Sequence, residues 1–331
     1  TPKPSSAASD VYKRQMLDLS TGISPRAYPT ADVTAQSWNQ LPSHSQLDTC
    51  LAAARRAYEV PEKLGIMAGA GTQSLLQFIP SLLPCGGIVW IDEPTYNEHR
   101  PAWEAAGHQV ITGDANLGKA QSAVIVAPNN PTGKFVHDAI MATAKQTATT
   151  GGIMLIDGAF AMPAAADPAA SDLLGALVAF PHVVHIRSFG KFFGMAGLRL
   201  GFAIGAAVHM DQLQRCVGPW AVSSVALDIG NTALNDTVWQ AQHSQFLRQQ
   251  TEQLQMVLTR ANLKILGGTT LFQTVKTSRA YHLHDHLAKA AIWTRKFLQM
   301  PDLLRFGVPE NAADFARLSE SLNNWRHKAN Q

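Results

Sequence analysis

The chain has 331 residues, of which 46% are hydrophobic and 15% charged, so it is long enough for about two globular domains and too apolar for a disordered protein. Its formal net charge of +3 is small, and its basic residues are scattered, which argues against nucleic acid as a partner. No apolar run approaches the roughly 18 residues of a membrane span and no signal pattern opens the chain, so we expect a cytoplasmic protein without a membrane partner.

The N-terminal region is polar and rich in proline. We expect residues 1–15 to be a disordered or non-native tail, with Met16 as the start of the native chain. From Leu17 to Pro42, glycine and proline interrupt any helical pattern and predict an extended arm with turns. The spacing of apolar residues then predicts a helix over 46–58. The cysteines form no C-x-x-C pair, so neither a disulfide framework nor a zinc site is indicated.

A glycine-rich turn opens the next predicted helix. Gly71, Thr72 and Gln73 lead into a helix that we expect to run to about Leu83. Backbone N–H groups and hydroxyls at such a position suit a phosphate, whereas Gly-x-Gly before a helix is as often a sign of tight packing. This motif alone leaves both interpretations open.

Predicted strands and helices then alternate along the chain. We predict helices over 97–106 and 136–149, and strands at 87–91, 109–112, 123–127, 153–156 and 183–187. This alternation predicts a largely parallel sheet that is covered on both faces. Ligands bind at the carboxyl ends of the strands in such sheets, so the loops that follow the strands are the candidate site.

Four of these loops carry Tyr96, Asn130, Asp157 and Lys191. Each of the first three has a structural explanation, because a tyrosine can pack, an asparagine can form a turn and an aspartate can cap a helix. Lys191 lies among aromatic and glycine residues, where it is either a surface residue or a desolvated, nucleophilic amine. One shared site explains the four residues more economically than four separate structural roles.

The chain changes character after Gly205. Helices dominate first, and short apolar segments that predict a small sheet follow. We predict a long helix over 238–262, a terminal helix over 312–327, and strands at 270–275, 291–293 and 303–306. The expected organisation is a large α/β domain and a small α+β domain. The large domain covers 46–235, and the small one combines 16–45 with 236–331.

A run of histidines lies between Tyr281 and His286. His282 and His286 share a helical face, which could suggest a metal site, but no further ligand is evident in the sequence. We therefore predict no metal and interpret the run as a solvated segment before or within a helix.

The motifs resemble those of the fold-type-I, pyridoxal-phosphate-dependent aminotransferase superfamily. They are Asn130-Pro131-Thr132-Gly133, the strand-end Asp157, and Ser188-x-x-Lys191 followed eight residues later by Arg199. The resemblance covers the chain from Leu17 onward. It implies an α/β fold of mainly parallel strands with a smaller α+β domain, a pyridoxal 5'-phosphate cofactor and a homodimer.

The resemblance also implies a role for each residue at the cofactor ring. Lys191 would form the Schiff base with the cofactor aldehyde. Asp157 would pair with the protonated pyridine nitrogen, because a buried carboxylate partner can hold that proton at neutral pH. Asn130 would donate a hydrogen bond to the phenolic oxygen, and Tyr96 would stack on the ring.

Further residues match the anion-binding positions of the superfamily. The cofactor phosphate would be held by Gly71, Thr72, Gln73, Ser188 and Arg199, since arginine matches phosphate with its planar fork. The α-carboxylate of the substrate would bind Arg305. A phosphate on the substrate would meet the N-terminal arm and a basic group, which we assign to Ser20, Thr21, Gly22 and Arg295.

Two branches of the superfamily resemble the chain in length and layout, and they differ in reaction. One is the histidinol-phosphate aminotransferases. The other is the threonine-phosphate decarboxylases of cobalamin biosynthesis. Three segments of the chain resemble this second branch more: Leu17–Gly22, Pro94–His99 and Arg187–Gly194. Phe160 agrees with this second branch, because transaminases usually carry tyrosine there. We therefore expect decarboxylation of L-threonine O-3-phosphate, with the aminotransferase as the alternative and a non-catalytic, cofactor-binding regulatory domain as a third.

The chain departs from its relatives at two positions. Gly158 stands where the family often has glutamate, which removes a carboxylate beside the site. Leu41-Pro42 stands where many relatives have a Tyr-Pro pair whose tyrosine reaches the partner subunit's cofactor phosphate.

Overall fold

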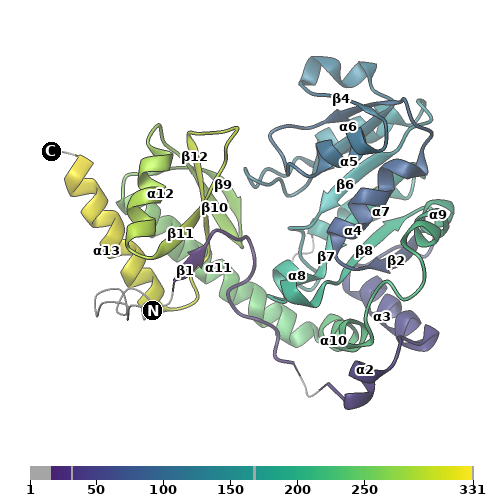
Figure 1. The fold of residues 1–331 in the computed structure, drawn as a ribbon, viewed down its shortest axis with the longest axis horizontal. Helices are drawn as coiled ribbons and strands as arrows, with labels where there is room; N and C mark the ends of the chain where they lie inside the picture. The colour runs from purple at the N-terminus through teal and green to yellow at the C-terminus, as the bar shows by residue number, and fades with distance from the viewer. Residues whose placement is uncertain (1–15, 31–32, 167–168, 330–331) are drawn as a thin grey trace, which may run out of the picture. The chain divides into compact units, whose positions relative to one another are not determined.

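The computed structural model describes residues 16–30, 33–166 and 169–329, so the predicted tail of residues 1–15 lies outside the described residues. The chain divides into two compact units (Figure 1). Unit 1 comprises Thr1–Pro25 and Leu247–Gln331, and unit 2 comprises Arg26–Phe246. Each unit has a sheet and an apolar core of its own.

A seven-stranded sheet with the order β2-β8-β7-β6-β5-β3-β4 forms the centre of unit 2. The five strands predicted from the sequence are confirmed and run parallel: β3 (Ile88–Ile91), β4 (Gln109–Ile111), β5 (Ser122–Val126), β6 (Met154–Gly158) and β7 (Val183–Ser188). The sequence did not reveal β2 (Gly65–Gly69) or β8 (Gly201–Gly205), which pair with each other in an antiparallel direction. Both strands begin and end with glycine, a residue depleted in strands.

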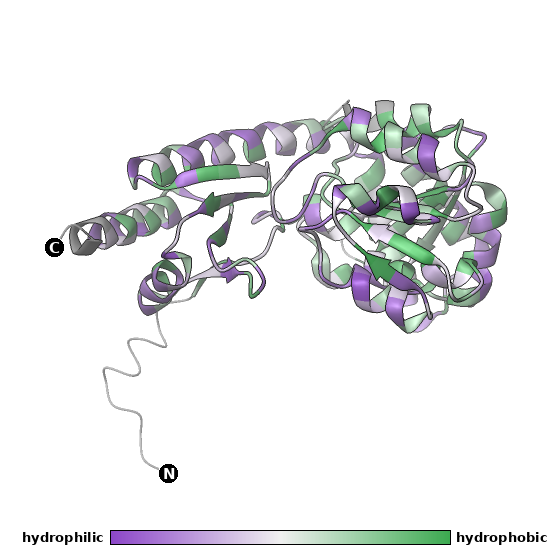
Figure 2. Ribbon diagram, turned by 90° about the horizontal axis from the view of Figure 1, so that it is seen from above, coloured by the Kyte–Doolittle hydropathy of each residue, from purple (hydrophilic) through white to green (hydrophobic). Residues whose placement is uncertain are grey.

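Helices cover both faces of this sheet, as predicted. Adjacent residues of a strand point to opposite faces, so Val124 lies in one apolar cluster and Ile125 in the other. The strands are coloured mostly hydrophobic in Figure 2, whereas the surrounding helices carry both colours. The helices of the first cluster include α4 (Thr72–Phe78), α5 (His99–Ala105) and α9 (Ala207–Val217), and those of the second include α6 (His137–Thr147) and α7 (Ala169–Leu177).

The N-terminal arm is divided between the two units. The sequence analysis placed domain boundaries after residues 45 and 235, whereas the units meet after Pro25 and Phe246. Residues 26–45 belong to unit 2 because Tyr28 donates its backbone N–H to Phe193 (2.8 Å) and Ser37 donates its hydroxyl to Asp228 (2.6 Å). A short helix, α2 (Ala35–Asn39), also interrupts the predicted extended arm. The helices α3 (His44–Ala57) and α10 (Ser224–Asn235) pack together in the same unit.

Unit 1 contains a five-stranded sheet with the order β1-β11-β12-β10-β9. Its strands are β1 (Leu17–Leu19), β9 (Lys264–Thr269), β10 (Phe272–Lys276), β11 (Ile292–Lys296) and β12 (Leu303–Gly307). The terminal helix α13 (Ala312–Ala329) and the long helix α11 (Thr237–Arg260), which contains the unit boundary, confirm two predicted helices. No helix within the described ranges is long and apolar enough to cross a membrane.

The histidine run forms the helix α12 (Ala280–Lys289). The expectation of a solvated segment is wrong for one face of this helix. His284 is only 2% exposed, and its Nδ1 lies 2.9 Å from the Thr294 hydroxyl. His286 bonds the carbonyl oxygen of Ser321. Among the described residues, no group of three or more His, Cys, Asp or Glu side chains could hold a metal ion.

Gly158 ends β6 at a point where no side chain fits. A Cβ atom at this position would lie 2.6 Å from Cε1 of His185, which β7 directs into the same space. The His185 ring is 2% exposed and cannot move aside without disturbing the core. Burial and the charge of Arg187 hold the pKa of His185 well below its usual value, so the ring packs as a neutral group. An imidazole therefore fills the space beside Gly158.

Gly158→Ala should lower the free energy of unfolding by about 1–3 kcal/mol, because overpacking displaces a buried ring. Denaturant unfolding measures this loss. Gly175→Ala is the matched control, since its Cβ would have no neighbour within 4 Å. The double variant Gly158→Ala, His185→Ala should lose less than the sum of its single variants. Equal stability of Gly158→Ala and the wild type would contradict this explanation.

Candidate functional site

Asp157 is a buried carboxylate near the carboxyl end of β6. Its side chain belongs to a residue only 3% exposed. Oδ1 accepts the backbone N–H of Ala159 at 2.9 Å, and Oδ2 lies 3.0 Å from Nε2 of His99. A buried carboxylate is stable only when hydrogen-bond donors surround it, and here one donor comes from the backbone after β6 and the other from α5. The group is thereby fixed in position and direction.

His99 is a site residue that the sequence analysis did not single out. It begins α5, is 1% exposed and supplies the hydrogen bond to Asp157. Its ring also meets Tyr96 edge to face, with centroids 5.9 Å apart. The spacing Tyr96-x-x-His99 after a parallel strand was the available signal, but nothing in the sequence shows that a histidine turns inward rather than toward solvent.

Tyr96 joins two of the predicted cofactor loops. Its hydroxyl donates to Oε1 of Gln73 at 3.0 Å, which links the loop after β3 to the first turn of α4. One face of the residue packs on the core cluster that includes Leu75. The structural and functional interpretations of Tyr96 are therefore compatible, because the contacts that pack the ring also hold it beside the glycine-rich turn.

Lys191 lies on α8 (Phe189–Phe192), directly after β7. The side chain is half-buried, and Nζ lies 4.5 Å from the centroid of the Phe160 ring. An aromatic face attracts an ammonium group, so the ring directs the amine toward the loop that follows Asp157. The structure thus places the carboxylate and the amine at the carboxyl ends of the neighbouring parallel strands β6 and β7.

The predicted phosphate-binding residues converge on the glycine-rich turn. A Cβ atom on Gly71, which has φ +78°, would lie 2.7 Å from Nη2 of Arg199. A Cβ on Gly201 would lie 2.6 Å from the backbone nitrogen of Thr72, and Gly201 pairs with Ser188 across β8 and β7. Gly71 and Gly201 therefore permit the close approach that brings the turn, Ser188 and the Arg199 guanidinium together.

Asn130 follows an asparagine that shapes its loop. Asn129 is 6% exposed, accepts two hydrogen bonds from Thr132 at 2.8 and 3.1 Å, and donates to the Pro94 carbonyl at 3.1 Å. It ties the loop after β5 to the loop after β3. Asn130 itself is half-buried, and its contact with a ligand stays a prediction.

The predicted substrate residues belong to unit 1. Arg305 on β12 is 6% exposed and donates from Nη2 to the Ser20 carbonyl at 2.8 Å. Arg295 on β11 stands directly opposite Arg305 in the antiparallel pair. Burial and the neighbouring charge of Arg295 lower the pKa of Arg305 to about 10. Thr21 lies close by, since its carbonyl oxygen would be 2.5 Å from a Cβ on Gly307, and Gly22 is buried in the same segment.

The residues of unit 2 fit an aromatic cofactor that carries a phosphate. Asp157 offers a fixed carboxylate to a ring nitrogen, and Arg199 with the Gly71 turn offers donors to a phosphate. A side chain at position 71 would fill the space that the Arg199 guanidinium occupies. Lys191 supplies a primary amine that can bond covalently to an aldehyde.

Comparisons with known proteins give the family. The sequence model of the family described as aminotransferase class I and II matches residues 35–319. The threonine-phosphate decarboxylase of Pseudomonas aeruginosa is 35% identical over 97% of this chain and 96% of its own length. That of a Sinorhizobium species is 36% identical over 92% of this chain and 91% of its own.

Solved structures agree in fold. The histidinol-phosphate aminotransferase of Clostridium acetobutylicum has a TM-score of 0.81 at 17% identity, over 95% of this chain and 100% of its own. That of Sinorhizobium meliloti, solved in complex with pyridoxal-5'-phosphate, has the same TM-score and identity over 99% and 96% of the two chains. The chain therefore belongs to the class I and II aminotransferase family and has the fold-type-I architecture that its motifs predicted.

Proposed function

We propose that the chain decarboxylates L-threonine O-3-phosphate to (R)-1-aminopropan-2-yl phosphate in cobalamin biosynthesis, with pyridoxal 5'-phosphate as its cofactor. Its similarity to threonine-phosphate decarboxylases over nearly the whole chain supports this reaction. The structural observation that carries the proposal is the position of Phe160, whose ring faces the Lys191 amine.

Within this proposal, the chain's own residues hold the cofactor in a fixed orientation. Lys191 binds its aldehyde, Asp157 holds a proton on its ring nitrogen and Tyr96 covers its ring. Gly71, Thr72, Gln73, Ser188 and Arg199 bind its phosphate, and Asn130 donates to its phenolic oxygen. When bound, the cofactor supplies a conjugated ring that accepts the electron pair of a bond broken at the substrate Cα.

Phe160 distinguishes this arrangement from that of a transaminase. A tyrosine here would place a hydroxyl near the amine, where it could accept or share a proton, whereas phenylalanine offers only a ring face. Transamination requires Lys191 to remove the proton from the substrate Cα. In decarboxylation, the carboxylate must leave Cα before any proton is transferred there. The choice rests on which substrate bond stands perpendicular to the cofactor ring.

Unit 1 offers two cations for a substrate with two anionic groups. A substrate carboxylate bound to Arg305 would favour the charged form of its guanidinium, which burial and the charge of Arg295 disfavour. Arg295 is exposed and stands opposite, so it can receive a second anion such as a phosphate. The arm beside Arg305 consists of Ser20, Thr21 and Gly22. Nη2 of Arg305 donates a hydrogen bond to the carbonyl oxygen of Ser20.

The reaction is tested with purified protein, pyridoxal phosphate and threonine phosphate. We expect CO₂ and aminopropanol phosphate in equal amounts, and we expect Lys191→Ala to abolish both because it removes the amine proposed to bind the cofactor aldehyde. Lys145→Ala, an exposed lysine on α6, is the matched control and should retain full activity. Amino-group transfer to 2-oxoglutarate without CO₂ release would instead establish the aminotransferase.

The substrate assignment predicts different losses for the two arginines. Arg305→Ala should lower kcat/KM by about 10- to 100-fold, because a charged hydrogen bond to the carboxylate is worth about 1.5–3 kcal/mol. Arg295→Ala should lower kcat/KM for threonine phosphate and should also reduce the preference of the enzyme for threonine phosphate over threonine. The control Arg279→Ala removes an arginine that stacks on Trp325. Equal losses in all three variants would refute the assignment.

The hydrogen bond between His99 and Asp157 predicts a stability difference in cofactor-free protein. His99→Leu should lower the free energy of unfolding by about 1–3 kcal/mol, because a buried carboxylate oxygen then lacks a donor. His108→Leu is the control, since this buried histidine bonds the neutral carbonyl of Pro80 and not a carboxylate in the described part of the chain. A smaller loss for His99→Leu than for His108→Leu, measured by denaturant unfolding, would contradict this role.

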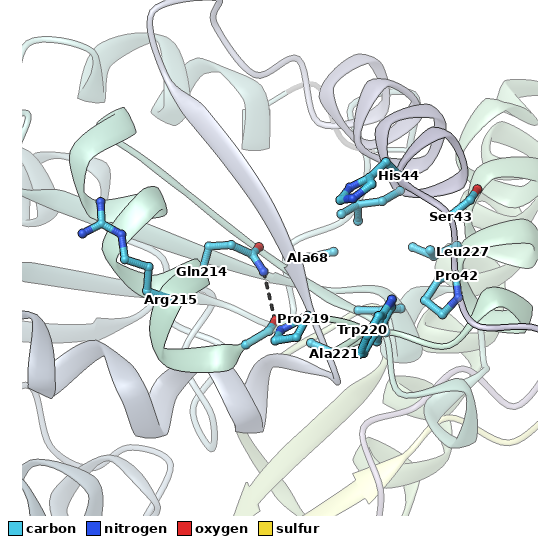
Figure 3. A pocket seen from close by; sticks show the side chains of 13 residues that line it. Pro42, Ser43, His44, Ala68, Gln214, Arg215, Pro219, Trp220, Ala221 and Leu227 are labelled. Atoms are coloured by element: carbon cyan, nitrogen blue, oxygen red, sulfur yellow. Dashed lines mark hydrogen bonds between the residues drawn. The ribbon is translucent and has the colours of Figure 1, made fainter.

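A groove in unit 2 supports the proposal of a homodimer. It measures about 600 Å³ and is lined by residues of α3, α9 and the following loop (Figure 3). Trp220 is 63% exposed there and has φ +54°, a strained conformation for a bulky residue. Leu41, at the position of the missing tyrosine, is 65% exposed. Exposed aromatic and aliphatic side chains beside a groove are typical anchors of an interface.

Trp220→Lys should convert a dimer to monomer by placing a charge in a desolvated interface. Light scattering after size-exclusion chromatography measures the mass. Val208→Lys, an exposed position on α9 that does not line the groove, should leave the dimer intact. A dimeric Trp220→Lys protein would show that another surface mediates association.

A further inference from the structure

A line of stacked aromatic rings begins beside Lys191. Phe189 and Phe193 flank the lysine on α8 and stack with centroids 4.3 Å apart. Phe193 stacks on Trp239 of α11 at 5.7 Å, and Trp239 stacks on His243 at 4.2 Å. The interplanar angles of these three pairs are 11° to 15°. The rings therefore form a continuous column from the lysine turn to the first turns of α11.

The column ends at the N-terminal arm. His243 stacks on Phe246 at 5.7 Å, and the guanidinium of Arg26 lies 3.9 Å from the Phe246 centroid. We call the five stacked rings, Phe189, Phe193, Trp239, His243 and Phe246, the aromatic ladder. Helical spacing explains part of it, because residues four apart, such as Trp239 and His243, lie one above the other on a helix.

The arm is tied to the lysine turn at a second point. Tyr28 donates its backbone N–H to the Phe193 carbonyl at 2.8 Å, and its hydroxyl donates to Asp236 at 3.1 Å. A Cβ on Gly194, which has φ +65°, would lie 2.6 Å from the Arg26 carbonyl oxygen. Only glycine lets the arm approach the turn this closely. The turn is therefore enclosed between the arm and the ladder.

The ladder is built from rings that stay neutral. His243 is 3% exposed, and burial lowers its pKa to about 4 even though it bonds the backbone of Phe192. Phe189 and Phe193 are fully buried. Flat, uncharged rings can stack without removing a charge from water. The column therefore persists across the physiological pH range.

The turn that carries Lys191 needs such support. The helix α8 has only four residues, and a helix of one turn has too few internal hydrogen bonds to hold its shape. The register of β7 fixes its beginning, but its end is held by contacts of Phe193 and Gly194.

We propose that the aromatic ladder and the arm segment Arg26–Tyr28 are a positioning element for the Lys191 amine. They fix the backbone of the turn, so that only the lysine side chain moves as the amine binds and leaves the cofactor. Trp239 and His243 act through Phe193 and are positioning residues. This inference rests on the proposed function, in which Lys191 binds the cofactor.

The test is the pH at which the visible absorbance of the enzyme-bound cofactor changes, because this midpoint reports protonation at the Lys191 nitrogen. In Trp239→Leu we expect the midpoint to rise by at least about half a pH unit, or about threefold in the protonation equilibrium. The physical reason is that a loosened turn admits water, which favours the charged form. Trp239→Phe keeps a flat ring and should retain the wild-type midpoint.

Trp90→Leu is the matched control, since it removes a buried tryptophan of β3 that belongs to an apolar cluster without any ring of the ladder. It should lower the thermal midpoint of unfolding without moving the absorbance midpoint. If Trp239→Leu does not fold, His243→Gln is measured in its place, because glutamine keeps a polar group near Phe192 but removes a ring. An unchanged absorbance midpoint, or the same shift in Trp90→Leu, would overturn the inference. Retention of the visible, lysine-bound absorbance in Lys191→Ala would instead overturn the proposed function.

Discussion

The site of unit 2 depends on one hydrogen-bonded carboxylate that is removed from water. A buried charge is tolerated only with donors around it, and Asp157 receives one from the backbone of Ala159 and one from His99. This requirement determines where α5 begins, because the helix must present His99 to the end of β6. The position of Tyr96 follows, since it packs edge to face on the same histidine and reaches the glycine-rich turn.

Close backbone approach is the second constraint on this unit. Gly71 leaves room for the Arg199 guanidinium, and Gly158 leaves room for the His185 ring. The second case changes the meaning of the missing glutamate at position 158. The sequence suggested a lost carboxylate, whereas the His185 ring fills this space in the structure, and burial lowers the pKa of that ring. At position 158 the His185 ring therefore takes the place of a larger side chain, so no vacancy is left beside the site.

The sequence predicted those features that follow from local patterns. Parallel strands and the polar residues at their ends were predictable, because alternation of strands and helices brings those ends to one edge. The strands β2 and β8 were missed since their glycines lack strand propensity. His99 was missed because its direction depends on a contact with Asp157, 58 residues away. The aromatic ladder was hidden for the same reason, since Trp239 and Phe193 are joined only by the fold.

In the proposed function, residues of unit 2 bind the cofactor and residues of unit 1 bind the anionic groups of the substrate. One fold can serve enzymes with different reactions, so the unit 2 residues proposed to bind the cofactor cannot by themselves select decarboxylation. Two features support the proposed decarboxylation. Phe160 removes a hydroxyl from the neighbourhood of the Lys191 amine, and Arg305 with Arg295 presents two positive charges on one face of a strand pair. Under the proposal, a substrate with two anionic groups would be held at both, and this restraint would orient the bonds at its Cα.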